Sequence, residues 1–169
     1  MKRFLSFFVA LVLTLGVMAQ TQHLKFQGIP LDGPISAFHQ KLVAKGFKHD
    51  AVTSKGLKNG RAFTGTFFGK KANLYVFYIP TTKVVAGLNI SLQDYDGESD
   101  YAQINRVLAK KYPEAEITEE DFEDKTTYTL DEGYITVSWE IGGLYVMFYD
   151  DANAEKYQQC QDEEYMNEL

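Results

Sequence analysis

Two stretches of the chain carry apolar residues at the three- and four-residue spacing that is typical of amphipathic helices. Pro34 suits the first position of the first helix, and Gly46 suits the residue just beyond its end. The second helix begins near Ser99 or Asp100, either of which can cap it, and it ends before Pro113. The apolar stripes consist of Ile35, Phe38, Leu42 and Val43 in the first helix and Tyr101, Ile104, Val107 and Leu108 in the second.

Each helix is followed by three apolar stretches that are typical of strands. Short spacers separate these stretches, so consecutive strands are expected to pair as antiparallel hairpins. The strands expected after the first helix are 61–68, 73–79 and 83–92, and those after the second are 126–130, 134–141 and 144–149.

The pattern therefore predicts an α+β protein in which two helix-plus-three-antiparallel-strand units form a layered helix-on-sheet domain. This single domain spans residues 20–152, and the stretches 24–92 and 99–152 are candidate repeats. Residues 153–169 form an acidic tail, with helical character expected at 152–159.

The strands differ in how many of their faces are apolar. In 134–141 the apolar residues Ile135, Val137, Trp139 and Ile141 alternate with polar ones, which predicts one buried face. The stretches 74–79 and 144–149 are instead apolar on both sides. Such strands are either covered on both faces or expose an aromatic surface that binds a partner. The candidate binding residues on this surface are Tyr75, Phe77, Tyr145, Met147 and Tyr149.

The first nineteen residues have the layout of a secretory signal peptide. Lys2 and Arg3 precede an apolar run, and cleavage is expected between Ala19 and Gln20. The run is short for a membrane span and no second one follows, so we expect no transmembrane segment in the mature chain. These features predict an exported protein, either periplasmic or secreted.

Charge is divided unevenly along the chain. Residues 20–92 carry 10 basic and 2 acidic side chains, whereas residues 93–169 carry 5 basic and 21 acidic ones. The net charge of −8 expected after cleavage argues against nucleic acid as a partner. The two halves either attract each other within one fold or present an electrostatic surface to a partner.

No catalytic residue is predicted, because the chain lacks a nucleophile elbow or a phosphate-binding glycine loop. Asp94, Asp96, Glu98 and Asp100 place carboxylates at alternate positions and are candidate ligands for Ca²⁺, although glycine stands at the fourth position of the loop and not the sixth. The acidic run 119–124 is expected to be a solvated connector, and three histidines share no metal-binding spacing.

Two resemblances add to these patterns. Residues 24–33 (LKFQGIPLDG), with Phe38, Leu42 and residues 45–47 (KGF) after them, resemble the start of small exported proteins of Bacteroidetes. The repeated helix-and-strand order is similar to the architecture of β-lactamase-inhibitor proteins, which implies binding of a protein across the sheet. The single cysteine, Cys160, cannot form the two disulfides that are typical of the inhibitor itself.

We therefore expect an exported, soluble binding or interaction module that lacks catalytic activity and a bound cofactor, with an unknown protein or glycan as its partner. One alternative is a small cell-envelope hydrolase or glycan-processing enzyme that uses Glu140 or the 94–100 loop. Another is an assembly protein whose basic half docks on the acidic half of a neighbouring copy.

Overall fold

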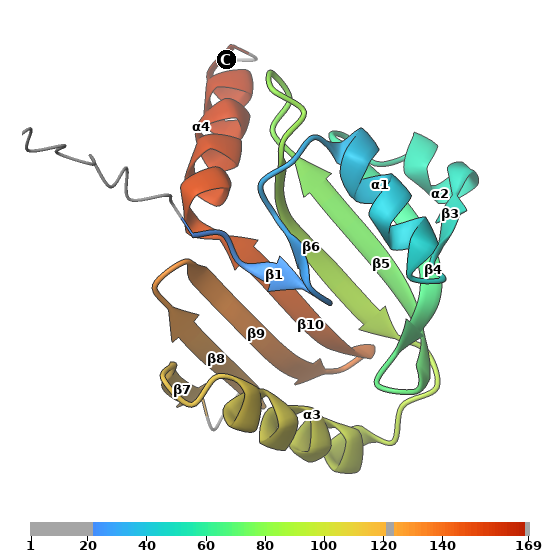
Figure 1. Ribbon diagram of the computed structural model, residues 1–169, viewed down its shortest axis with the longest axis vertical. Coiled ribbons are helices and arrows are strands. Elements are labelled where there is room, and N and C mark those ends of the chain that lie inside the picture. Colours follow the sequence, from blue (N-terminus) through green and yellow to red (C-terminus); the bar gives the residue numbers. More distant parts are fainter. Residues whose placement is uncertain (1–21, 121–123, 168–169) are drawn as a thin grey trace, which may run out of the picture.

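An eight-stranded antiparallel sheet forms the body of the protein (Figure 1). The structure is a computed structural model that describes residues 22–120 and 124–167. The strand order across the sheet is β3-β4-β5-β6-β10-β9-β8-β7. The strands are β3 (Lys48–Asp50), β4 (Gly60–Phe67), β5 (Lys70–Tyr78), β6 (Val85–Leu92), β7 (Glu116–Glu120), β8 (Lys125–Leu130), β9 (Gly133–Glu140) and β10 (Gly143–Asp150).

The sheet is built from two runs of consecutive strands that meet at its centre. β3 to β6 are neighbours in chain order, and so are β7 to β10, while β6 pairs with β10 along Leu92↔Leu144 to Gly87↔Tyr149. Each run contains four strands, one more than the sequence pattern predicts. The additional strands, β3 and β7, are the two outer strands of the sheet.

The fold is mixed α+β. Four helices accompany the sheet in the described residues, together with a small hairpin of β1 (Lys25–Phe26) and β2 (Ile29–Pro30). The helices are α1 (Ile35–Ala44), α2 (Ala51–Lys55), α3 (Gly97–Lys111) and α4 (Asp151–Asn167).

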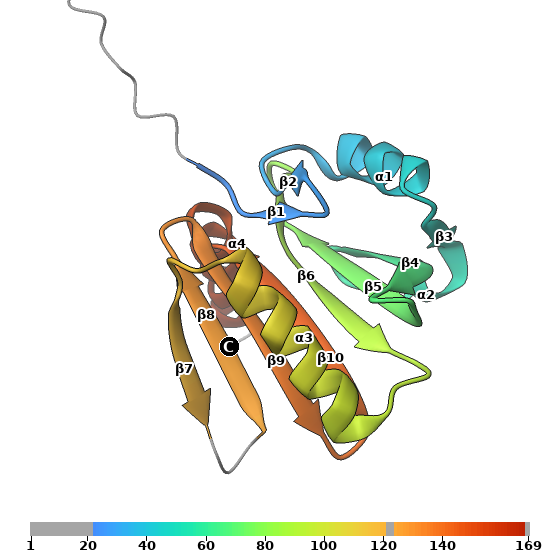
Figure 2. The same cartoon turned by 60° about the horizontal axis from the view of Figure 1, so that its bottom comes forward.

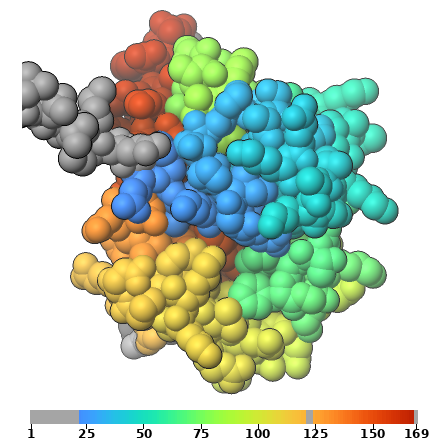
Figure 3. Space-filling view, viewed as in Figure 1, coloured from blue at the N-terminus to red at the C-terminus, as the bar shows by residue number. Residues whose placement is uncertain are grey.

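The hydrophobic core lies against one face of the sheet, beneath α1, α3 and the β1–β2 hairpin. Phe26 of the hairpin is fully buried, with its ring centroid 5.4 Å from that of Phe148 and 5.8 Å from that of Phe67. Ile104 and Leu108 of α3 are buried in the same core. Complete burial of such side chains contributes about 1.5–3 kcal/mol each. The space-filling view shows the N-terminal segments and α3 hiding much of the sheet from this side (Figure 3).

Helix α4 lies against the opposite face of the sheet, behind the strands when α3 is in front (Figure 2). It follows β10 directly, contacts β6, β10 and β9, and extends the expected helix at 152–159 in both directions. Asn153 is the buried residue of this helix, so α4 adds little to the apolar core. The acidic segment after residue 152 is thus largely a helix placed on the sheet.

Several local expectations are corrected by the structure. Val43 is 49% exposed and does not join the core stripe, because it faces away from the sheet near the end of α1. Ile141 is fully exposed because β9 ends at Glu140 and Ile141 stands in the turn that follows. Residues 116–120 form β7 where 119–124 was expected to be a connector, and 121–123 lie outside the described residues.

The start of the chain bears on export. The expected signal peptide, residues 1–19, lies outside the described residues, so export stays a prediction. Among residues 22–120 and 124–167, no helix combines the length and the apolar character that crossing a membrane requires.

Candidate functional site

The five residues predicted to bind a partner lie on the same face of the sheet, opposite the core. Alternate residues of a strand point to one side, and β6 pairs with both β5 and β10, so the register places all five together. Each of them is partly buried. We call this surface the aromatic face. Its two central rows, in register across β5, β6 and β10, are Tyr75–Asn89–Met147 and Phe77–Gly87–Tyr149.

The side chains between these aromatic residues are neutral and polar. In the four central strands, charged residues on this face stand near strand ends, Lys71 in β5 and Glu140 in β9. A neutral centre with charges at its border is the usual composition of a protein-binding surface. The polar residues of this centre are Asn73, Asn89, Ser91, Thr136 and Ser138.

Two buried polar atoms on the aromatic face lack a hydrogen-bond partner among the described residues. They are Oδ1 of Asn89 and Oγ of Ser138. Ser138 is 1% exposed and stands beside Tyr145 in the register. A buried polar group without a partner costs about 1–3 kcal/mol, so both atoms are an unfavourable feature of this face.

Two glycines allow aromatic rings to lie flat against the sheet. A Cβ on Gly143 would stand 2.6 Å from Cζ of Tyr145, and one on Gly87 would stand 3.2 Å from Cδ1 of Tyr149. A side chain at Gly143 would therefore displace the ring of Tyr145, and one at Gly87 would crowd the ring of Tyr149. The flat rings give this face broad aromatic surfaces.

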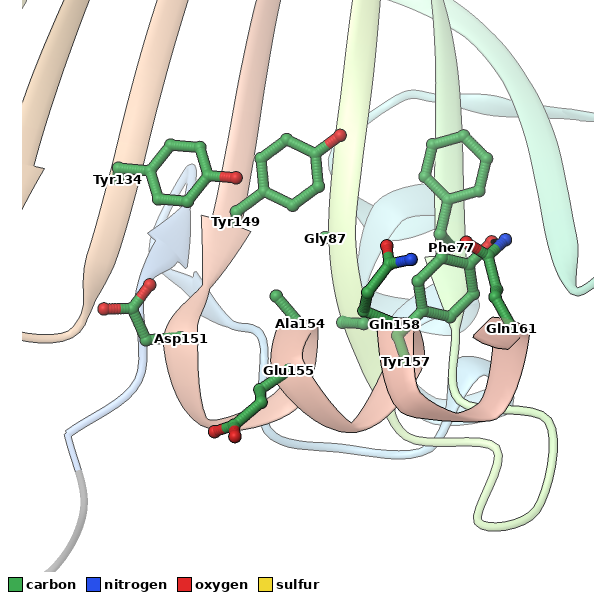
Figure 4. Close-up of a pocket in the computed structure, with 11 residues that line it drawn as sticks. Phe77, Gly87, Tyr134, Tyr149, Asp151, Ala154, Glu155, Tyr157, Gln158 and Gln161 are labelled. Atoms are coloured by element: carbon green, nitrogen blue, oxygen red, sulfur yellow. Dashed lines mark hydrogen bonds between the residues drawn. The ribbon is translucent and has the colours of Figure 1, made fainter. Parts of the chain in front are cut away.

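A cleft of about 680 Å³ opens where α4 passes over the end of the aromatic face (Figure 4). Phe77, Gly87 and Tyr149 line it from the sheet. Tyr134 of β9 lines it beside Tyr149, and Tyr157 lines it from the helix. The remaining lining residues are Ala86, Asp151, Ala154, Glu155, Gln158 and Gln161.

The aromatic rings of the cleft form two pairs. Tyr134 and Tyr149 stack with ring centroids 5.0 Å apart and 22° between planes, and Phe77 and Tyr157 lie 6.3 Å apart. Burial raises the pKa of all three tyrosines, and Tyr149 and Asp151 nearby raise the pKa of Tyr134 further. The three phenols are therefore neutral at pH 7.

Tyr134 and Tyr157 are the aromatic residues of the cleft that sequence reasoning missed. The alternation in 134–141 does place Tyr134 on the side away from the core, together with Thr136 and Ser138. The pairing of β9 with β10, which brings Tyr134 to Tyr149, cannot be read from that alternation. Tyr157 lies in a segment too polar to predict its packing.

The position of α4 is fixed by a buried polar cluster at its first turn. The carboxylate of Asp150 accepts hydrogen bonds from the backbone N–H groups of Leu24 and Asn153, and it lies 2.9 Å from Nδ1 of His23. The side-chain amide of Asn153 donates to the carbonyl of Leu31 at 2.8 Å. Burial raises the pKa of Asp150, while the hydrogen bond with His23 opposes that rise. These bonds tie α4 to the N-terminal segment.

The predicted calcium loop is partly neutralised by lysines. Lys71 lies 3.2 Å from Asp94, and Lys70 lies 3.0 Å from Asp100. Asp100 also accepts a hydrogen bond from the backbone N–H of Asp96, and this bond, with the Lys70 ammonium, lowers the pKa of Asp100. Within the described part of the chain, no three acidic, histidine or cysteine side chains are grouped to hold a metal ion. Calcium binding by Asp94, Asp96, Glu98 and Asp100 stays a prediction.

The residues considered for catalysis are scattered. Glu140 is exposed at the end of β9 and is not among the residues that line the α4 cleft. His39 and His49, which the sequence did not connect, have ring centroids 4.8 Å apart on the core side of the sheet. Nη1 of Arg61 lies 3.0 Å from Nδ1 of His39. Burial, His49 and Arg61 together lower the pKa of His39.

Comparison of the chain with protein-family models, with curated proteins and with solved structures finds no match. The geometry of the aromatic face is therefore the basis for a functional proposal.

Proposed function

We propose that this protein is a non-catalytic binding module whose partner is a protein that docks on the aromatic face. The observation that carries the proposal is the placement of Tyr75, Phe77, Tyr145, Met147 and Tyr149 on one partly exposed face of the three adjacent strands β5, β6 and β10. The hydrophobic core lies on the opposite face of the same strands, and none of these five side chains belongs to it.

The composition of the face favours a protein over other partners. Tyrosine provides large, rigid contact area at little entropic cost, while serine and asparagine supply adaptable hydrogen bonds, as in antibody binding sites. Charged residues are depleted at the centres of protein interfaces, and here the central strands carry them near strand ends. Tyr75 and Tyr145 are the natural energetic anchors of such an interface.

The enzyme alternative has less support from the geometry. Two carboxylates of the 94–100 loop are paired with lysines, and Glu140 stands apart from the α4 cleft. A carboxylate pair for glycoside hydrolysis requires two acids facing each other across a cleft. A glycan partner without catalysis is compatible with the tyrosines of the aromatic face, and the experiment below distinguishes it.

We also infer that the aromatic face is formed jointly by two repeated units, each of which has a helix followed by strands and contributes a helix-on-sheet layer. Helix α1 precedes β3–β6, and α3 precedes β7–β10, with α2 inserted in the first unit. The last strands of the two units, β6 and β10, pair at the centre. The partner would therefore contact both units at once. Export, if the signal peptide acts as expected, would place this partner in the periplasm or outside the cell.

The test is affinity capture from native cell-envelope extract, using the protein and the double variant Tyr75→Ala/Tyr145→Ala. Tyr165→Ala serves as the matched control, because Tyr165 is 62% exposed near the end of α4 and does not belong to the face. Thermal unfolding shows whether each variant folds.

We expect one protein to be retained by the wild type and by Tyr165→Ala but lost by the double variant. The purified pair should then reproduce this order of affinities. Retention of the partner by a folded double variant would exclude the aromatic face. Retention that disappears after glycosidase treatment of the extract would assign the face to a glycan.

A further inference from the structure

The cleft beneath α4 is rich in aromatic rings. Phe77 and Tyr149 stand on either side of Gly87 in one row of the sheet, and Tyr157 approaches from the helix (Figure 4). A Cβ on Gly87 would stand 2.7 Å from the carbonyl oxygen of Phe148, so a side chain cannot occupy this position without moving the sheet. Gly87 therefore leaves the part of the cleft between Phe77 and Tyr149 free of a side chain.

The faces of these rings carry the negative part of the aromatic quadrupole, which attracts cations. The tyrosines do not compete by ionising, because burial raises the pKa of Tyr134, Tyr149 and Tyr157. A cation in the cleft would therefore meet neutral phenols, whose rings attract it by the same effect as that of Phe77. The Tyr134–Tyr149 stack also braces the orientation of Tyr149.

Every charged residue that lines the cleft is acidic. Asp151 and Glu155 stand one turn apart on α4, and lysine, arginine and histidine are missing from the described residues of the lining. The side-chain N–H groups of Gln158 and Gln161 donate to Asp162 and to the hydroxyl of Tyr157, respectively. Their carbonyl oxygens are left as acceptors, beside the second N–H of each amide. The two carboxylates give the lining its negative charge, which favours a positively charged occupant, while the phenol hydroxyls can donate or accept.

We propose that this cleft is a subsite for the positively charged side chain, lysine or arginine, of a partner protein. The proposal rests on the proposed function, because the cleft adjoins the aromatic face and shares Phe77 and Tyr149 with it. The apolar stem of the inserted side chain lies against the rings, and its charged head lies toward the side of the cleft that Asp151 and Glu155 line. Helix α4 carries five acidic residues and one lysine, so its field also favours the approach of a basic segment.

Nα-acetyl-lysine methylamide is the probe, and Nα-acetyl-norleucine methylamide is its uncharged counterpart of similar shape. Each is titrated into the protein while the NMR signals of Tyr149, Tyr157 and Gln158 are followed. We expect the lysine compound to shift these signals and to bind at least about tenfold more tightly than the norleucine compound. Equal affinities, or no response to the lysine compound, would overturn the proposal.

Variants of the two acidic lining residues test whether they recognise the positive charge of the lysine compound. We expect Asp151→Asn combined with Glu155→Gln to weaken lysine binding by about fivefold, as exposed carboxylates that pair with a cation do. Glu163→Gln, on the same helix but outside the cleft lining, should leave the affinity unchanged. Circular dichroism confirms that α4 is retained in each variant. An unchanged affinity in the double carboxamide variant would exclude this site, as would tighter binding of N-acetylglucosamine than of the lysine compound.

The two proposals fail separately. Tyr75 and Tyr145 do not line the cleft, so Tyr75→Ala/Tyr145→Ala should lose the partner protein while it still binds the lysine compound. A protein that keeps its partner in that variant refutes the aromatic face, whatever the probe does. A protein that needs the aromatic face for its partner but does not respond to the lysine compound refutes the subsite alone.

Discussion

The carboxylate of Asp150 accepts a hydrogen bond of 3.0 Å from the backbone N–H of Leu24, 126 residues earlier in the chain. Asp150 is completely buried, at the junction of β10 and α4. It therefore holds the N-terminal segment, the central strand and the helix over the aromatic face at one point.

Replacement of Asp150 by alanine should destabilise the protein strongly. The substitution leaves the N–H groups of Leu24 and Asn153 and the ring of His23 without their acceptor. We expect the free energy of unfolding to fall by about 3 kcal/mol, measured by urea denaturation. The matched control is Asp131→Ala, in an exposed turn, which should change it by less than about 0.5 kcal/mol. A loss as small in Asp150→Ala as in the control would contradict this role.

The same carboxyl group should leave a signature in the pH dependence of stability. Burial raises the pKa of Asp150 above the ordinary 3.8, so the folded state binds this proton more readily than the unfolded state. The part of the stability that comes from the more favourable protonation of Asp150 in the folded state is therefore complete below pH 3.8 and is lost as the pH rises through the folded pKa, while the hydrogen bonds from Leu24 and Asn153 remain. Relative to Asp150→Asn, which does not titrate, the wild type should lose stability over that window. A difference between the two proteins that does not vary with pH would contradict the raised pKa.

Gly87→Ala should disturb both the sheet and the cleft. The new Cβ would stand 2.7 Å from the carbonyl oxygen of Phe148, so the pairing of β6 with β10 must shift. We expect a loss of about 1–3 kcal/mol in the free energy of unfolding. Gly33→Ala is the control, because a Cβ there meets no atom within 4 Å and should be nearly neutral. Crystal structures of both variants would show whether Tyr149 has moved, and equal stabilities would argue against close contact at Gly87.

The pairing of His39 with His49 predicts sensitivity to mild acid. Burial, His49 and Arg61 lower the pKa of His39 below the ordinary 6.5, so the folded state binds this proton less readily than the unfolded state. Stability is therefore lost as the pH falls from above 6.5 toward the folded pKa. The loss between about pH 7.5 and about pH 5.5 should be smaller in His39→Gln than in the wild type, measured by thermal unfolding. An identical loss in both would assign the acid sensitivity to other groups.

The sequence predicts the two sides of the central strands well, because side-chain alternation survives folding. In 144–149, the residues Leu144, Val146 and Phe148 are buried in the core, and Tyr145, Met147 and Tyr149 are on the other side. Because alternate side chains of a strand point to opposite faces of the sheet, the alternation alone decides which of these residues are buried in the core. That these residues join Tyr75 and Phe77 depends on the pairing of β6 with β10, for which the sequence has no local signal.

The outer strands could not be predicted from hydrophobic pattern. β7 is mostly exposed, and even its Ile117 is 45% exposed, so the pairing of its backbone with β8 defines it. β3 has three residues, and Asp50 at its end caps α2 by accepting from the N–H groups of Val52 and Thr53. Short polar strands at sheet edges resemble loops in sequence, although they protect the edge from further pairing.

The start of α3 shows how a cap can be misplaced by a few residues. The sequence suggests Ser99 or Asp100 as the cap, whereas the helix begins at Gly97 and Asp96 is its N-cap residue. Asp100 instead lies one turn into the helix, and its carboxylate accepts from the backbone N–H of Asp96. The capping residue types at this point correctly indicated the start of a helix, but they did not show which residue stands at the N-cap.

The pairing of β6 with β10 has a consequence for how the chain folds during synthesis and for how two copies can associate. Neither half of the sequence possesses both of these strands, so a fragment ending near residue 92 would expose β6 as a long apolar edge. Such an edge invites another copy to supply the missing strand. During synthesis, the first half must wait for the second before that edge is closed, and two chains caught at this stage could exchange halves to form an intertwined dimer.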